Sequence, residues 1–228
     1  MSVRDPGLAR EADIAPAPDP TAGRTAGAWK PADPGPLGLT GFATTTFVLS
    51  VINAGLVGGG VATASGVVIG LALAYGGIAQ FVAGLWEFRT GNTFGATAFC
   101  SFGAFWISFY VLLHIGASAI PKTELFSAVS LYLYAWAIFT AFMFVASLRT
   151  TGAISLVFLL LAITFILLGI GNAQLTGGTA TTNGMVKLGG WFGIVTAVAA
   201  WYASMAGVVN ATWGRTVLPV FPLNTPRA

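Results

Sequence analysis

The feature that most constrains this 228-residue chain is a series of six apolar stretches, each long enough to cross a lipid bilayer. A helix needs roughly 20 mainly apolar residues for such a crossing. The stretches contain no proline, and short segments rich in glycine or polar residues separate them. We therefore predict an all-α integral membrane protein, built as a bundle of six transmembrane helices. The predicted helices lie near residues 38–58, 63–88, 94–116, 126–148, 153–171 and 187–210.

Charged residues are scarce in this sequence. They make up 7% of the chain, against 56% hydrophobic residues, and the mean hydropathy is +0.82. A soluble domain of this composition would lack the charged surface that keeps it in water. The positive residues give a net charge of +3 but are scattered singly, so they form no stripe that would bind nucleic acid. We expect the lipid bilayer, and no nucleic acid, as a partner.

Most of the charge and most of the prolines precede the first apolar stretch. Nine charged residues and seven of the eleven prolines fall in the first 36 positions. A segment of this composition cannot bury enough apolar surface to order itself. We predict a disordered tail over residues 1–35, a six-helix transmembrane domain over 36–215, and a short C-terminal tail over 216–228.

Basic residues fall mainly on one side of the predicted bundle. Six crossings place both termini on the same side, together with the second and fourth loops. That side carries eight basic residues, whereas the other side carries Lys122 and Lys187. By the positive-inside rule, both termini are cytoplasmic and the protein is a multi-pass protein of the cytoplasmic (inner) membrane. The eight residues are Arg4, Arg10, Arg24, Lys30, Arg89, Arg149, Arg215 and Arg227.

The order of the segments is compatible with an internal repeat. Three crossings would reverse the direction of the second unit, so the first and last three helices would form a 3+3 inverted repeat. Gly91-Asn92 follows the second predicted helix as Gly171-Asn172 follows the fifth. A repeat and a chance match both fit this observation.

Polar side chains within the predicted helices are candidates for the lining of a pore. Thr46, Ser50 and Asn53 share one face of the first helix, at positions i, i+4 and i+7. The amide of Gln80 needs several hydrogen-bond partners when it is buried. All four side chains either bond neighbouring helices or line a pore, and both readings stay open. Glu87, at the end of the second helix, either pairs with a neighbouring arginine or orders a pore mouth.

Signs of an enzyme are missing from the sequence. The apolar stretches hold no carboxylate pair and no histidine cluster, and the chain has no Walker A loop or nucleophile placed with a base. The single cysteine, Cys100, does not make a metal site. We predict no catalytic residue, no metal and no cofactor.

Three sequence blocks resemble those of one family. Residues 34–39 read PGPLGL, residues 75–95 hold YGGIAQ and GNTFG, and residues 214–219 read GRTVLP. Together they resemble the acetate uptake transporter family, also called the succinate/acetate permease family, over about residues 33–220. The resemblance implies six helices per protomer and a homohexamer with a pathway inside each protomer. It also implies the passage of acetate, related monocarboxylates and sometimes succinate.

The resemblance further implies roles for single residues. The family lines its narrow passage with a Phe, a Tyr and a Leu, and these positions correspond to Phe42, Phe102 and Leu161. A small residue of the last helix that affects substrate size corresponds to Ala200. Further pore-lining candidates, from the motifs and the polar faces, are Thr46, Ser50, Asn53, Tyr75, Gln80, Glu87 and Asn92.

Two departures from the family pattern matter. Asp33 stands where the first block, usually written NPAPLG, has Asn, and Phe102 replaces the Tyr. The first change adds a charge and the second removes a hydroxyl, so we expect substrate preference or rate to differ from that of close relatives. The family does not decide between a channel and a proton symporter. The alternative function is a membrane-embedded structural or sensory protein without transport activity.

The predicted topology can be tested with reporter fusions. Alkaline phosphatase becomes active only in a compartment where its disulfides form. A fusion after Ala228 should therefore be inactive, and a fusion in the loop at Lys122 should be active. Activity of the C-terminal fusion would overturn either the number of helices or their orientation.

Overall fold

The computed structural model describes residue 29 and residues 31–57, 60–175 and 182–224, with the backbone alone for residues 60–65. The chain divides into two units, Met1–Lys30 and Pro31–Ala228, and the second contains every described helix. Most of the tail that we predicted therefore lies outside the described residues.

Six helical spans, all long and apolar enough to cross a membrane, run through the described part of the second unit. The predicted all-α bundle of six helices is confirmed, with helix ends that shift by a few residues. Two spans consist of successive segments without a break. The spans are α1 (Gly35–Asn53); α2 (Gly60–Leu73), η1 (Ala74–Ala79) and α3 (Gln80–Thr90); α4 (Thr93–Val111), η2 (Leu112–Gly116) and α5 (Ala117–Ala119); α6 (Leu125–Ser147); α7 (Gly152–Ala173); and α8 (Gly184–Trp213).

The segments η1 and η2 are π-helical turns, which occur often at functional sites. η1 is in close contact with α1 and α4, and glycine makes this contact possible. A Cβ atom on Gly76 would lie 2.6 Å from Thr45 Oγ1 and 2.8 Å from Trp106 Cδ1. The second span therefore meets both neighbouring helices at this turn.

Short polar residues fix several helix starts. Asn92 directly precedes α4 and Asn183 directly precedes α8, and each side-chain Oδ1 accepts the backbone N–H three residues on, at 3.0 and 2.9 Å. Thr151 Oγ1 accepts the same kind of bond for α7, at 3.3 Å. Such caps satisfy N–H groups that a helix leaves unpaired. Gly91 ends α3 with a φ of +78°, in the left-handed conformation that favours glycine.

We predicted that the pair Gly171-Asn172 follows the fifth span, and this prediction is wrong. Both residues lie inside α7, which continues to Ala173, and Asn172 Nδ2 donates to the carbonyl oxygen of Leu168 at 2.8 Å. The residue that caps the next helix, as Asn92 does, is Asn183. The 3+3 inverted repeat remains a prediction, without this pair in its support.

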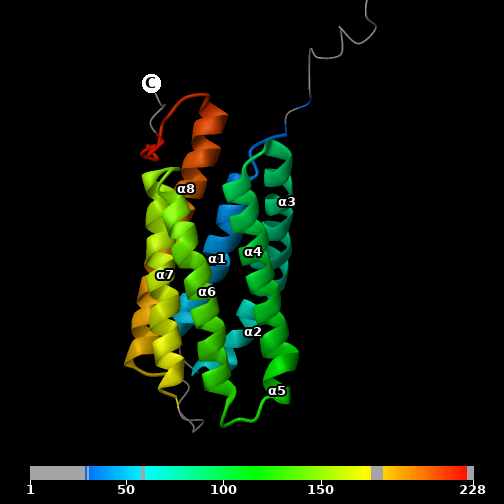
Figure 1. The fold of residues 1–228 in the computed structure, drawn as a ribbon, viewed down its shortest axis with the longest axis vertical. Helices are drawn as coiled ribbons and strands as arrows, with labels where there is room; N and C mark the ends of the chain where they lie inside the picture. Colours follow the sequence, from blue (N-terminus) through cyan, green and yellow to red (C-terminus); the bar gives the residue numbers. More distant parts are fainter. Residues whose placement is uncertain (1–28, 30, 58–59, 176–181, 225–228) are drawn as a thin grey trace, which may run out of the picture. The chain divides into compact units, whose positions relative to one another are not determined.

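Helix α1 lies between two groups of helices (Figure 1). One group consists of α6, α7 and α8, in which α7 packs on both neighbours and α1 packs on α8. The other group consists of the second span and α4, in which α3 packs on α4 and α1 contacts the second span. α4 and α6 are connected by aromatic side chains, such as Phe105 and Trp136, rather than by a close approach of their backbones. We call the end of the bundle where α1 begins and α8 ends the terminal end, and the other the opposite end.

Glycine also brings α3 and α4 together. A Cβ atom on Gly103 would lie 2.8 Å from the backbone nitrogen of Phe81, and one on Gly84 would lie 2.5 Å from that of Cys100. A change of side-chain rotamer cannot relieve a contact with backbone. Because lipid supplies no hydrophobic attraction between helices, close packing of this kind stabilises their association.

The segment after α8 folds back onto the terminal end. Asn210 exchanges two bonds with Leu218: its Oδ1 accepts the Leu218 N–H at 2.9 Å, and its Nδ2 donates to the Leu218 carbonyl at 2.8 Å. Three backbone bonds then tie the segment to the α6–α7 turn and the start of α7: from Gly152 N to Phe221 O at 2.7 Å, from Ala153 N to Val220 O at 3.3 Å and from Leu223 N to Thr150 O at 2.9 Å. The described part of the predicted C-terminal tail is thus attached to the bundle.

The glycine contact between α3 and α4 predicts a measurable loss of stability. Gly103→Ala should lower the free energy of unfolding by about 1 to 3 kcal/mol because the added methyl group overpacks the backbone of α3. The control is Gly184→Ala, where a Cβ atom would meet nothing within 4 Å. Thermal unfolding of the purified variants should give a lower midpoint for the Gly103 variant alone. Equal midpoints would contradict the close contact.

Candidate functional site

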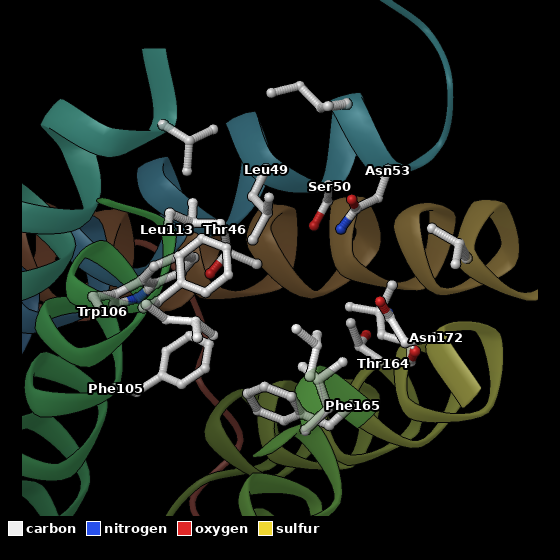
Figure 2. A pocket seen from close by; sticks show the side chains of 18 of the residues that line it. Thr46, Leu49, Ser50, Asn53, Phe105, Trp106, Leu113, Thr164, Phe165 and Asn172 are labelled. Carbon is white, nitrogen blue, oxygen red and sulfur yellow. Dashed lines mark hydrogen bonds between the residues drawn. The ribbon is translucent and has the colours of Figure 1, made fainter. Parts of the chain in front are cut away.

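A cavity of about 370 Å³, which we call the chamber, lies among the described residues (Figure 2). Its walls come from α1, from α4, η2 and α5, and from α6, α7 and single residues of α2 and α8. It extends from the middle of the bundle to the opposite end. The lining residues are Phe42, Thr46, Leu49, Ser50, Ile52, Asn53, Val68, Phe105, Trp106, Phe109, Leu112, Leu113, Ala117, Leu125, Phe126, Val129, Leu133, Leu161, Thr164, Phe165, Leu168, Asn172 and Val186.

The chamber has a polar side and an apolar side. Ser50 and Asn53 from α1 and Thr164 and Asn172 from α7 gather at one side in Figure 2, away from Phe105 and its neighbours. Hydroxyl and amide groups can donate hydrogen bonds to an anion without carrying a charge. The polar side can therefore hydrate or bind a small solute, whereas most of the remaining wall is apolar.

A second, much smaller cavity of about 20 Å³ lies toward the terminal end. Phe42 and Leu161 line both this small cavity and the chamber, so these two side chains form a partition between them. Both side chains are buried, with 4% of their surface exposed. The remaining residues of the small cavity are Leu39, Gln80, Ala98, Phe99, Phe102, Val157 and Phe158.

Phe102 lies beside this partition. Its ring centroid is 5.7 Å from that of Phe42, and it lines the small cavity only. Further aromatic rings fix its position, with centroids 5.4 to 6.5 Å away. These rings belong to Trp136, Phe139, Phe158 and Phe165. The structure thus brings together the three residues of the expected constriction, while their role in selecting a substrate remains a prediction.

Unpaired polar atoms gather on the walls of the two cavities. Buried polar atoms without a hydrogen-bond partner are rare in proteins. The described residues contain four such atoms, and three belong to cavity-lining residues: Thr46 Oγ1, Trp106 Nε1 and Gln80 Oε1. Gln80 is 1% exposed, so its amide is deeply buried beside the small cavity. Sites that bind a polar solute keep such groups available for it.

Four of the predicted residues lie away from both cavities. Tyr75 lies in η1, where its carbonyl oxygen faces Gly41, and Ala200 is fully buried in the core. The Glu87 carboxylate accepts hydrogen bonds from Asn92 Nδ2 at 2.9 Å and from Thr90 Oγ1 at 3.2 Å. These bonds brace the turn before α4. Neither the Glu87 carboxylate nor the Asn92 amide lines the chamber or the small cavity.

Sequence reasoning did not select Thr164 and Asn172 for the polar side of the chamber. Both share a face of α7 with Leu161 and Leu168, at helical spacing. That spacing was visible in the sequence, but α7 is so apolar that nothing marked this face as the one that meets a cavity. Nor did sequence reasoning select Trp106, whose indole nitrogen is one of the unpaired polar atoms.

The lining carries no charged side chain among the described residues. Nor do the described residues hold a group of three or more His, Cys, Asp or Glu that could bind a metal. Six membrane-spanning helices around two cavities with neutral polar groups, separated by an apolar partition, define the class of membrane passages for small solutes.

The chain belongs to the GPR1/FUN34/yaaH family, whose model matches residues 19–225. The resemblance read from the sequence is confirmed, and the match begins before residue 33, where we had placed its start. The chain is 41% identical over 198 residues to "Acetate permease A" of Emericella nidulans, covering 83% of this chain and 65% of that relative. It thus spans about two thirds of the length of the fungal protein.

Two bacterial comparisons cover almost the whole of the matched protein. The chain is 38% identical over 194 residues to "Succinate-acetate/proton symporter SatP" of Escherichia coli, covering 84% of this chain and 96% of the relative. The "Structure of the bacterial acetate channel SatP" matches with a TM-score of 0.72 and 38% identity, covering 84% of this chain and 99% of that one. The fold is therefore shared with a solved membrane channel.

The unpaired Oε1 atom of Gln80 predicts a variant that keeps or gains stability. Gln80→Leu removes a buried oxygen without a partner, whose desolvation costs about 1 to 3 kcal/mol. The thermal unfolding midpoint should therefore stay equal or rise. Thr140→Val is the control, because the buried Thr140 hydroxyl has a partner, the Trp136 carbonyl oxygen at 2.7 Å. A marked loss of stability in the Gln80 variant alone would show that the amide holds the fold together.

Proposed function

We propose that this protein is a passage for acetate and related small carboxylates, such as succinate, across a membrane. The observation that carries the proposal is the partition of Phe42 and Leu161, with an uncharged cavity on each side. Relatives described as an acetate permease, a succinate-acetate/proton symporter and an acetate channel support the choice of substrate. The proposed function does not involve the catalysis of a reaction.

Small carboxylates need such a passage at neutral pH. Their pKa, close to that of an Asp or Glu side chain at about 4, leaves only a minute fraction neutral at pH 7. The anion meets a steep energy barrier in hydrocarbon. Ser50, Asn53 and Asn172 can donate hydrogen bonds to a carboxylate in the chamber, and the Gln80 amide can do so beyond the partition. Only the apolar partition of Phe42 and Leu161 separates these two sets of donors.

We favour conduction without obligatory proton coupling. A tightly coupled symporter needs a titratable group that the substrate meets on its way, and no charged side chain lines either described cavity. Apolar constrictions of the kind formed by Phe42 and Leu161 gate other pores by excluding water. The relatives' descriptions include both a symporter and a channel, so they favour neither.

We also infer that the protein resides in the cytoplasmic (inner) membrane with both termini in the cytoplasm, and that it assembles as a homo-oligomer, a hexamer in the family's pattern. The eight-to-two distribution of basic residues supports the orientation. Small residues at exposed positions of α2, such as Gly66 and Gly70, support helix contacts between protomers.

Uptake of labelled acetate into proteoliposomes tests the proposed function. We expect saturable uptake with the purified protein, and no uptake with empty vesicles. Uptake that proceeds at equal pH on both sides, and that an imposed pH gradient leaves unchanged at equal acetate anion concentration, would support a channel. Absence of acetate and succinate flux from correctly folded protein would favour the alternative of a structural or sensory membrane protein.

The partition predicts a change of selectivity on truncation. Phe42→Ala and Leu161→Ala should widen the passage and raise the flux of lactate and succinate relative to acetate. Phe144→Ala is the control, because this side chain packs against the core but lines neither cavity. All three variants are expected to lose about 2 to 5 kcal/mol of stability, so the flux ratios are normalised to folded protein. Flux ratios that match those of the Phe144 variant would show that Phe42 and Leu161 only pack the core.

A further inference from the structure

The chamber is larger and more apolar than acetate requires. Its volume of about 370 Å³ falls in the range of roughly 300 to 1,000 Å³ that is typical of sites for drug-sized ligands. Acetate offers a single methyl group to such a wall. Phe105, Phe109, Leu113, Phe126 and Val129 would then face water or empty space, at a cost in free energy. A ligand with a longer apolar part would cover them.

The two sides of the chamber fit a ligand with a carboxylate at one end. Asn172 uses Nδ2 as a donor to Leu168 and keeps a second N–H on the same nitrogen, and the amide of Asn53 has two N–H donors. An acyl chain that starts there can lie along the apolar residues of α4, η2 and α6. Figure 2 shows Asn53 and Asn172 together, apart from Phe105 and Leu113.

A ligand of this kind meets a greater barrier at the partition than acetate does. The cavity beyond Phe42 and Leu161 measures about 20 Å³, room for about one water molecule, so the helices have to open further for each added carbon of an acyl chain. We propose that the chamber is a binding site for medium-chain monocarboxylic acids such as octanoate, which occupy it and block the passage without crossing. The blocking part of this proposal rests on the proposed function, whereas the binding part does not.

The chain-length dependence of affinity follows from the apolar wall. Each buried methylene group contributes enough transfer free energy for about a fourfold increase in affinity. Inhibition of acetate uptake should therefore strengthen steeply from butanoate through hexanoate to octanoate. It should level off once the chain fills the chamber.

The experiment combines binding with flux. The full-length protein in nanodiscs is titrated with labelled octanoate, and acetate uptake into proteoliposomes is measured with butanoate, hexanoate, octanoate and 1-octanol. We expect octanoate to bind and to inhibit, and 1-octanol, which lacks the carboxylate, to do both at least fivefold less well. Equal inhibition by octanoate and 1-octanol would overturn the proposal, because it would reflect a general effect on the bilayer.

Variants separate the chamber from the lipid-facing surface. Ala117→Phe fills the chamber and should weaken octanoate binding at least tenfold, whereas Ala119→Phe, at an exposed position outside the chamber on the same short helix, should not. Val129→Phe replaces the first variant if that one does not fold. Unchanged octanoate binding in both chamber variants would overturn the proposal.

The outcomes also distinguish this proposal from the proposed function. Octanoate binding that depends on Ala117 or Val129, in a protein without acetate flux, would support the chamber site and contradict the proposed function. Acetate flux that is equally insensitive to butanoate and octanoate would support the proposed function and overturn the chamber site.

Discussion

Every backbone N–H and C=O group in the hydrocarbon core has to find its hydrogen bond within the protein, because lipid offers none. A helix meets this demand within one segment, so six apolar segments become six helices regardless of their neighbours. The demand does not attract one helix to another. Glycines such as Gly84 and Gly103 allow that attraction by letting backbones approach. Where the backbones stay further apart, as between α4 and α6, aromatic side chains span the distance and space remains for the chamber.

The chamber and the small cavity depend on polar atoms that the fold leaves without partners. In a medium of low dielectric constant, an unpaired polar atom is costly, and most proteins avoid it. Here Thr46, Gln80 and Trp106 each carry one, and all three residues line a cavity. The three unpaired atoms lower the stability of the protein. Functional sites often do so, which is consistent with a role of these atoms in binding a solute.

The number and order of the helices were predictable from the sequence, because length and apolarity are local properties. The shared face of Thr46, Ser50 and Asn53 was predictable too, since the helical period is regular. Helix α7 gave no such guidance. It is apolar on every side, so the face that carries Thr164 and Asn172 was visible only after α1 and α7 were placed around one cavity. Motif residues can also serve the fold: Glu87 and Asn92 bond each other at a turn and line neither described cavity.

The segment that follows α8 has a consequence for biosynthesis. Gly152 and Thr150, at the turn between α6 and α7, receive their hydrogen-bond partners from Phe221 and Leu223, near the end of the chain. A ribosome that has just delivered α6 and α7 to the membrane has not yet translated those partners, because α8 comes between them in the chain. The α6–α7 hairpin can therefore insert early, but this end of it can be locked only after α8 has been made. The order of synthesis thus delays the closure of the terminal end.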